Sequence, residues 1–462
     1  MVTKARLWSG SPARRLTSDA SDADLDGAGA RPDVLVVGLG YVGLTLAVGL
    51  ACAGVHVLGY EIDGSRIDRL SEGVVTFCEP GLAEALGALP SQQLRFNAEL
   101  PDHLPPATIL CVGTPIDPVS LEPRLEALEA AATAIGQRAC EGDLIVVRST
   151  VPVGTTRRVV LPKLSHLCHP KLAFSPERTI QGRALQELRE LPQVIGGIDG
   201  ASCDATCALF AALCDKQVRV SSLEAAELVK LVNNAHTDTL YAFGNEVALI
   251  AEQLGLDARE VRRAANVDYP RPDIAGPGFV GGGCLTKDPY LLMASMPRAG
   301  YMPQMVPAAR RLNESLPRHV VERFCAAVQE ADGDRGPTRP TVVVCGLAYK
   351  GNPPTDDLRG SAAPLVLECL RGQGFDVVAH DHLVTASAAA ALGVPLMSLD
   401  DAFVGARGAI FLTDHPGYRE LDIGRVVSTM ERPAVILDCW GVVDDRLGDQ
   451  VPGVRCLRLG RG

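Results

Sequence analysis

The chain has 462 residues, which at about 150 residues per domain predicts about three domains and is ample for a buried core. Its composition, 47% hydrophobic and 21% charged, is ordinary globular usage and excludes a disordered, fibrous or coiled-coil protein. The net charge is 44 minus 55, or −11, with scattered basic residues and only 4% aromatic residues. These values argue against wholesale binding to nucleic acid or anionic membranes.

The 14 cysteines are dispersed, without a Cys-x-x-Cys pair, and no secretory signal precedes them. This pattern favours a reducing cytoplasm over a disulfide framework. His166, Cys168 and His169 are close enough in sequence to suggest a metal site, but they lack a second ligand pair at zinc-finger spacing. We therefore expect no metal.

Residues 1–32 have no hydrophobic period and are expected to form a flexible tail. Stretch 34–60 is uncharged apart from His56 and long enough to span a bilayer, but six glycines divide it into strand, turn, helix and strand. No transmembrane or targeting segment is seen elsewhere. From 33 to 220 the alternation of β-rich and helical runs predicts βαβ units and a parallel sheet. Strands are expected at 34–37, 55–58, 108–112, 144–148, 172–174 and 194–195.

A long apolar helical run from 223 to about 254 follows, and Gly255 supplies its stop. With further helices to about 330 it predicts a central helical dimerisation domain, residues 221–330. A charged, Pro/Gly-rich linker is expected at 331–340. The alternation then resumes in a second α/β domain, 341–462, with strands expected at 341–345, 376–379, 409–412 and 434–437. The predicted fold class is α/β, with two Rossmann-like parallel-sheet domains joined by a long central helix and a helical dimerisation region.

The clearest motif is GLGYVG at Gly38–Gly43, which follows a strand and opens a helix. Its glycines allow a tight turn and the close approach of a pyrophosphate to a helix N-terminus. Glu61, 18 residues past Gly43, can bind a ribose 2′-OH and repel a 2′-phosphate, which Arg66 only partly offsets. The motif predicts NAD rather than NADP as the cofactor.

A second motif is GFVGGGCLTKD at residues 278–288. Cys284 follows three glycines, where the backbone can approach a ligand closely, and Lys287 can lower the thiol pKa. On a third segment, Glu227, Lys230 and Asn234 are spaced to share one helix face. Taken alone, these two patterns also fit a buried cysteine and a solvated helix face.

The motifs taken together resemble the UDP-glucose/GDP-mannose dehydrogenase family over about residues 33–445. Its signatures here are GLGYVG, GTP at 113–115, STVPVGTT at 149–156, SPER at 175–178, AELVKLVNN at 226–234, GGGCLTKD and GLAYK at 346–350. The resemblance implies four-electron oxidation of a nucleotide-sugar C6 alcohol to a carboxylate with two NAD⁺. It implies that the Cys284 thiolate adds to an aldehyde, giving a thiohemiacetal, then a thioester that water cleaves.

The resemblance also implies residue roles. Lys230 and Asn234 would stabilise the oxyanion, Asp288 would activate water or accept the alcohol proton, and Thr150 and Glu177 would position the water; which carboxylate is the base stays open. The catalytic set is thus Cys284, Lys230, Asn234, Asp288, Glu177 and Thr150. The expected cofactor-binding residues are Gly38, Gly40, Tyr41, Val42, Gly43, Glu61, Arg66, Thr114, Thr150 and Lys287. The expected substrate-binding residues are Glu177, Arg178, Lys230, Asn234, Gly281, Tyr349, Lys350 and Arg359.

Two departures from the family pattern bear on the substrate. Gln181 stands where hexose-specific members carry a second glutamate, and Arg178 adds donors, which resembles the branch acting on UDP-N-acetylhexosamines. Trp440 replaces an arginine that in many relatives reaches a neighbouring active site, which puts completion of a site by the partner subunit in doubt. We expect a cytoplasmic homodimer, formed through the central helix, that oxidises a UDP-sugar, with UDP-N-acetyl-D-mannosamine the favoured substrate. The alternatives are UDP-glucose, a two-electron dehydrogenase, and a non-catalytic NAD-binding sensor or scaffold.

Overall fold

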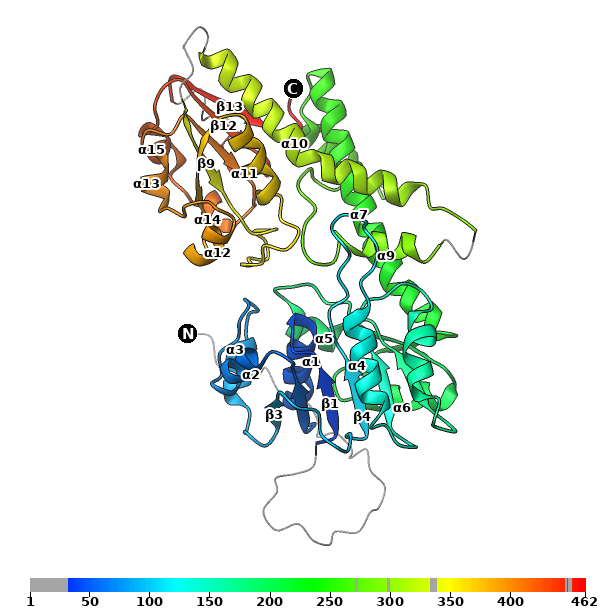
Figure 1. The fold of residues 1–462 in the computed structure, drawn as a ribbon. Helices are drawn as coiled ribbons and strands as arrows, with labels where there is room; N and C mark the ends of the chain where they lie inside the picture. The colour runs from blue at the N-terminus through cyan, green and yellow to red at the C-terminus, as the bar shows by residue number, and fades with distance from the viewer. Residues whose placement is uncertain (1–31, 271–272, 297–299, 333–338, 445–446, 448–450) are drawn as a thin grey trace. The chain divides into compact units, whose positions relative to one another are not determined.

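A computed structural model describes residues 32–270, 273–296, 300–332, 339–444, 447 and 451–462, and it divides into two compact units (Figure 1). The first contains the described residues up to Asn233 together with Tyr290–Tyr301, and the second contains Asn234–Pro289 and Met302–Gly462. Nearly all of the predicted tail and most of the predicted linker lie outside the described residues. The predicted division into separate cofactor, central and C-terminal domains stays a prediction.

The first unit is built on an eight-stranded sheet of order β3-β2-β1-β4-β5-β6-β7-β8. Its strands are parallel except that β7 runs antiparallel to β6. Because of this reversal, the chain between β6 and β7 both starts and ends at the carboxyl edge of β6, where α/β proteins bind ligands. The strands are β1 Val34–Val37, β2 Val57–Tyr60, β3 Leu94–Asn97, β4 Ala107–Leu110, β5 Leu144–Val147, β6 Lys171–Phe174, β7 Gln193–Gly197 and β8 Gln217–Arg219.

Helices cover both faces of this sheet, which is why its central strands are apolar throughout. Val34 and Val36 pack with α1 on one face, while Leu35 and Val37 pack with α4 on the other. The helices are α1 Tyr41–Cys52, α2 Gly64–Ser71, α3 Leu82–Ala88, α4 Glu126–Gly136, η1 Thr156–Val160, η2 Leu161–Leu164, α5 Ala184–Glu190 and α6 Gly200–Phe210.

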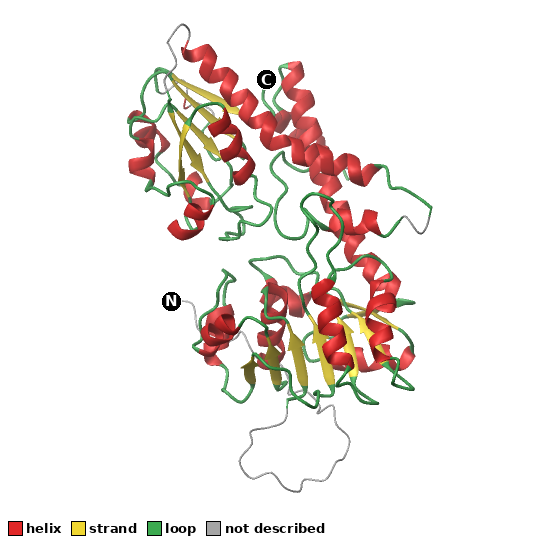
Figure 2. Ribbon diagram, in the orientation of Figure 1, coloured by secondary structure: helices red, strands yellow, loops and turns green. Residues whose placement is uncertain are grey.

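The second unit holds a five-stranded sheet of order β10-β9-β11-β12-β13, in which every pair is parallel. Val342 and Val344 face α10 and α11, whereas Val343 and Cys345 face α13 and α15. The strands are β9 Thr341–Cys345, β10 Asp376–His380, β11 Gly408–Phe411, β12 Ala434–Asp438 and β13 Val454–Arg458. Figure 2 shows the helices around each sheet, and these two α/β units confirm the predicted fold class.

The long helix α7 (Leu223–Leu254) contributes residues to both units and ends at Gly255, whose φ of +67° suits the left-handed position after a helix. The remaining helices are α8 Ala258–Asn266, α9 Asp288–Ala294, α10 Met305–Asp332, α11 Ala363–Gly372, α12 Ala386–Ala391, α13 Leu399–Phe403, α14 Pro416–Arg419 and α15 Ile423–Ser428. Among the described residues, no helix is both long and apolar enough to cross a membrane.

Candidate active site

The glycine loop lies at the switch point of the first sheet, between β1 and β4, where strand order reverses. Gly38 has a φ of +89°, and a Cβ there would lie 3.0 Å from the carbonyl oxygen of Cys111. A Cβ on Gly43 would lie 1.8 Å from the carbonyl oxygen of Gly38, whereas Gly40 borders open space. Packing therefore requires glycine at positions 38 and 43. Gly40 instead leaves open space before α1 that fits a dinucleotide pyrophosphate.

Glu61 follows β2 and lies beside this loop. Its Oε2 accepts hydrogen bonds from the backbone N–H of Leu39 (3.0 Å) and from Arg66 Nη1 (3.1 Å), and its Oε1 accepts one from Asp63 N–H (3.2 Å). A carboxylate in this position can bind the ribose 2′-OH of NAD. Glu61 and Arg66, which the sequence places close together, thus form an ion pair.

The loops after β4 and β5 are joined by side-chain hydrogen bonds. Thr114 Oγ1 donates to the carbonyl oxygen of Thr150 (2.5 Å), and Ser149 Oγ donates to that of Val112 (2.7 Å). Glu227 on α7, fully buried, accepts hydrogen bonds from the N–H groups of Gly154 and Thr156. Burial raises the pKa of Glu227. One member of the predicted α7 stripe therefore holds the STVPVGTT segment in place.

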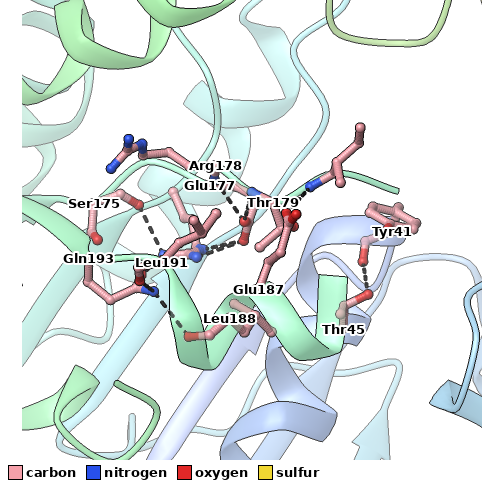
Figure 3. A network of polar contacts seen from close by, with 12 residues as sticks. Tyr41, Thr45, Ser175, Glu177, Arg178, Thr179, Glu187, Leu188, Leu191 and Gln193 are labelled. Carbon is pink, nitrogen blue, oxygen red and sulfur yellow. Dashed lines mark hydrogen bonds and ion pairs between the residues drawn. The ribbon is translucent and has the colours of Figure 1, made fainter. Parts of the chain in front are cut away.

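Glu177 lies in a buried polar network of the first unit (Figure 3). Its Oε2 accepts two hydrogen bonds from Arg148 (2.7 and 3.0 Å), and its Oε1 accepts two from the backbone N–H groups of Arg178 and Thr179 (both 2.8 Å). Burial disfavours its charge, but Arg148, these hydrogen bonds and the nearby Lys230 outweigh burial and lower the pKa of Glu177. All the usual acceptor positions of this carboxylate are in use, so the structure supports Glu177 as the anchor of its loop.

Lys230 is buried on α7, and among the described residues its Nζ has no hydrogen-bond acceptor. Arg178 donates through Nη1 to the carbonyl oxygen of Pro192 (3.3 Å), while its buried Nε has no acceptor within the described chain. Two cations of the first unit thus retain donor capacity next to the Glu177 loop, as expected of groups that bind a polar substrate.

In the second unit, the Cys284 side chain is exposed at the end of the triple-glycine run. Its carbonyl oxygen accepts hydrogen bonds from the N–H groups of Lys287 (3.1 Å) and Asp288 (2.9 Å), which forms a turn that leads into α9. The Asp288 carboxylate, fully buried, accepts hydrogen bonds from Asn234 Nδ2 (2.5 Å) and Lys287 Nζ (2.7 Å). The structure therefore joins Asn234 of α7 by hydrogen bonds to Lys287 and Asp288, which follow Cys284 closely in the chain.

The predicted nucleotide-binding residues contact the same loop. Gly282 N–H donates to the carbonyl oxygen of Arg359 (3.0 Å), and a Cβ on Gly281 would lie 2.8 Å from Tyr349 Cβ. Hydrogen bonds to Asp357 raise the pKa of Arg359, and the neighbouring Cys284 adds to this effect. Tyr349 and Lys350 follow β9 at the switch point of the second sheet, with Lys350 Nζ 5.4 Å from the Tyr349 ring centroid.

A buried network supports the Cys284 loop within the second unit. Asn245 Oδ1 accepts a hydrogen bond from Gly278 N–H (2.8 Å), and Asn313 Nδ2 and Arg310 Nη1 donate to Asp238 Oδ1 (2.8 and 2.6 Å). Arg310 also donates to the carbonyl oxygen of Leu285 (3.3 Å). Trp440 packs against Gly278, where a Cβ would lie 2.4 Å from the indole ring. Trp440 thus packs onto this unit's own loop.

The sequence interpretation missed several supporting residues. In the first unit these are Arg148 and Glu79. The Glu79 carboxylate accepts hydrogen bonds from Tyr41 Oη (2.5 Å), Gly182 N–H (2.6 Å) and Ala184 N–H (2.7 Å). In the second they are Asp238, Asn245, Arg310 and Asn313. One signal was available, because Asp238 and Asn245 are polar residues seven apart on a mostly apolar helix. No group of three metal-ligating side chains is found within the described ranges.

Three family models match the chain. They are the NAD binding domain (residues 32–214), the central domain (224–315) and the UDP binding domain (343–445) of the UDP-glucose/GDP-mannose dehydrogenase family.

Whole-chain relatives agree with these matches. The chain is 32% identical to UDP-N-acetyl-D-mannosamine dehydrogenase of Methanocaldococcus jannaschii, over 95% of this chain and 98% of the relative. It resembles the solved UDP-D-ManNAc dehydrogenase of Pyrococcus horikoshii with a TM-score of 0.83 and 30% identity, covering 93% of this chain and 99% of that one. For the solved UDP-glucose dehydrogenase of Pyrobaculum islandicum the TM-score is 0.80 and the identity is 30%, covering 95% of this chain and 100% of that one.

Proposed function

Because the chain belongs to the UDP-glucose/GDP-mannose dehydrogenase family and oxidises a nucleotide sugar with NAD, we propose that it converts UDP-N-acetyl-D-mannosamine to the corresponding uronic acid. The observation that carries the four-electron route is the exposed thiol of Cys284, which has Arg359 beside it. A dehydrogenase that stopped at the aldehyde would need no thiol.

The first unit would hold NAD through the glycine loop and Glu61. The open space at Gly40 and the N-terminus of α1 suit the pyrophosphate, and the Glu61 carboxylate suits the ribose diol. When bound, NAD⁺ accepts a hydride from the substrate carbon in each of two oxidations. The balance is one alcohol, two NAD⁺ and one water giving one carboxylate, two NADH and three protons.

In the proposed mechanism, removal of the C6 hydroxyl proton accompanies the first oxidation, with the Asp288 carboxylate as the acceptor and the Lys230 cation favouring the transfer. The Cys284 thiolate then adds to the aldehyde carbon, forming a C–S bond and an oxyanion that Lys230 and Asn234 stabilise. Donors of this kind typically contribute about 3–4 kcal/mol each to the transition state. The hydrogen bond from Asn234 to Asp288 would hold the amide in position.

The thiohemiacetal carbon still carries one hydrogen, so the second oxidation yields a thioester on Cys284. Water adds to this thioester, the C–S bond breaks, and the thiolate leaves with the carboxylate as product. Arg359 would stabilise the thiolate both before attack and after release. Thr150 and Glu177 are proposed to help hold this water. In this structure the four acceptor positions of Glu177 are used by Arg148, Arg178 and Thr179.

The route is tested by stoichiometry. We expect wild-type protein to form two NADH per sugar, and Cys284→Ala to form no uronic acid. Cys140→Ala, which removes another exposed thiol, is the matched control and should keep full activity. One NADH per sugar, with an unchanged rate in Cys284→Ala, would favour a two-electron dehydrogenase instead.

The substrate is tested with a panel of UDP-sugars, following NADH absorbance. Gln181, in place of a second glutamate, supports an N-acetylhexosamine, while the UDP-glucose dehydrogenase neighbour from Pyrobaculum islandicum supports UDP-glucose as the second candidate. We expect turnover of UDP-N-acetyl-D-mannosamine to exceed that of its epimers and of UDP-glucose. Turnover of UDP-glucose alone would overturn the assignment.

We further propose that two copies of the chain associate through α7. Its exposed apolar residues Leu240, Phe243, Ile250 and Leu254 recur, with the half-buried Val247, at alternating spacings of three and four. This is the spacing of a helix face that packs against another helix. Contiguous exposed apolar surface of this kind is typical of protein interfaces.

A further inference from the structure

The second unit contains a cavity of about 620 Å³ beside α8 that the proposed chemistry does not use. Four arginines line it, Arg259, Arg262, Arg263 and Arg458, with two carboxylates, Asp257 and Glu260. The lining therefore carries a net charge of 4 minus 2, or +2, in a chain whose overall charge is −11. A local cluster of positive charge attracts anions even in a protein whose net charge is negative.

The arginines of this cavity differ in their hydrogen-bond partners within the protein. Arg458 donates to the carbonyl oxygen of Val443 (2.5 Å) and lies 3.5 Å from Asp438. In contrast, the described part of the chain offers no hydrogen-bond acceptor to the side chains of Arg259, Arg262 and Arg263, and the Nε of Arg262 is buried. Buried donors without partners are rare in folded proteins because they lose their hydrogen bonds to water.

The fold also makes room for one of these groups. Gly441 has a φ of +73°, and a Cβ there would lie 1.7 Å from Arg259 Nη1, so the guanidinium lies directly against this glycine. Burial lowers the pKa of Arg259, and repulsion by Arg458 lowers it further. The carboxylate of Asp257 is engaged elsewhere, since its Oδ1 accepts the N–H of Arg259 and caps α8. Asp438 and Asp257 attract the Arg259 guanidinium, but burial and the repulsion by Arg458 and Arg419 outweigh this attraction.

Arg259, Arg262 and Arg263 are spaced i, i+3 and i+4 on α8, so they share one helix face. Guanidinium groups bind phosphate oxygens through paired hydrogen bonds, and three of them can serve more than one phosphate. The cavity volume falls within the range of small-molecule sites, about 300–1,000 Å³, and exceeds what one phosphate needs. We propose that this cavity binds the di- or oligophosphate group of a small molecule through Arg259, Arg262 and Arg263.

This site goes beyond the proposed function, because none of its residues takes part in the NAD or C6 chemistry above. Its ligand has two sources with the same chemistry: the diphosphate of the nucleotide-sugar substrate, or a separate phosphorylated effector. The experiment below measures binding without turnover, so it can fail independently of the proposed oxidation.

The test is titration of full-length protein with inorganic pyrophosphate at low salt, by calorimetry and by thermal unfolding. Saturable binding is expected for wild-type protein and for the control Arg425→Gln, which removes an exposed arginine paired with Asp400. Arg259→Gln and Arg262→Gln should each weaken binding about tenfold or more, as loss of a paired charge-assisted contact predicts. Arg263→Gln, which changes an exposed side chain, provides a variant that should fold in any case.

A purely structural role for the arginines gives a different pattern. It predicts that Arg262→Gln lowers the melting temperature without ligand and leaves pyrophosphate binding intact, which would overturn the proposal. The proposal predicts an unchanged or higher melting temperature, because the substitution removes no hydrogen bond among the described residues and relieves repulsion. Absence of saturable binding to wild-type protein would also overturn it. Saturating UDP identifies the source: competition indicates the substrate diphosphate, and persistent pyrophosphate binding indicates a separate effector.

Discussion

At the residue scale, Arg148 and Glu177 illustrate how a buried ion pair shapes a loop. Arg148 is 1% exposed, and it also donates to Gln193 Oε1 (3.3 Å) and to the carbonyl oxygen of Ser175 (3.4 Å). Such a pair offsets the cost of removing two charges from water only when both partners are present. The pair therefore matters less for net stability than for the conformation that it imposes on the chain after β6.

Arg148→Met should destabilise the protein by about 3–5 kcal/mol, because it leaves a buried carboxylate without its cation. Loss of the cation should also raise the pKa of Glu177, which is held low in the native protein. Urea unfolding at pH 7 measures the change. Arg157→Ala, which removes an exposed ion pair with Glu224, should cost only about 0–1 kcal/mol and serves as the control. Equal effects of the two substitutions would contradict the prediction.

At the same scale, we propose that Glu61 controls the choice of dinucleotide. Glu61→Ala removes the carboxylate that repels a 2′-phosphate and frees Arg66 to bind one. We expect the ratio of kcat/KM for NADP⁺ to that for NAD⁺ to rise about tenfold or more. Initial rates with each dinucleotide give this ratio. Glu72→Ala, at an exposed position after α2, should leave it unchanged, and an unchanged ratio in Glu61→Ala would refute the assignment.

At the element scale, α7 supplies side chains with distinct tasks on its different faces. Glu227 holds the segment after β5, Asp238 and Asn245 support the Cys284 loop, and Phe243 and Ile250 are exposed. A helix of 32 residues can do this because its faces recur every 3.6 residues.

The exposed face of α7 predicts an oligomeric state. Phe243→Glu and Ile250→Glu should each shift the protein from dimer to monomer, because a charge would be buried at the interface. Sedimentation velocity at micromolar concentration measures the shift. Val404→Glu changes a single exposed apolar residue outside α7 and should leave the dimer intact. A wild-type monomer would refute dimerisation through this face.

At the scale of the whole molecule, three histidines make stability depend on pH. His380, His382 and His415 form a ring cluster with Tyr418, and His382 stacks on His415 with ring centroids 4.2 Å apart. Burial lowers the pKa of all three, that of His380 to about 4, although Asp381 opposes the shift. Below their ordinary pKa of 6.5, the unfolded chain therefore binds protons that the folded chain does not.

The contribution of these histidines to the free energy of unfolding should consequently be fully present above pH 6.5. It should fall as pH decreases from 6.5 toward 4. Thermal unfolding across this range measures the effect. The double substitution His380→Gln and His382→Gln should flatten the slope between pH 6.5 and 5, where carboxylates contribute less. A double variant whose slope equals that of wild-type protein would show that other groups cause the dependence.

The predicted strands match the structure closely in the interior of each sheet and fail mainly at the edges. The missed strands β3, β8 and β13 are all edge strands. Interior parallel strands are covered on both faces, so they appear as continuous apolar runs. Edge strands tolerate polar residues such as Arg95, Gln217 and Arg455, and this removes the pattern. The sequence predicted β7 as a strand but not its direction. That direction depends on how residues 175–192 connect β6 to β7 in three dimensions.

The sequence by itself determined the α/β fold class, the glycine loop with Glu61 and the long helix, and it selected Cys284 as the candidate nucleophile. These features depend on neighbouring residues, whose hydrophobic period and backbone freedom are read locally. Only the tertiary structure decided that Glu227 holds Gly154, that Arg148 neutralises Glu177, and that four arginines converge on one cavity. Such contacts join residues far apart in the chain, and packing in three dimensions, which no local pattern encodes, selects them.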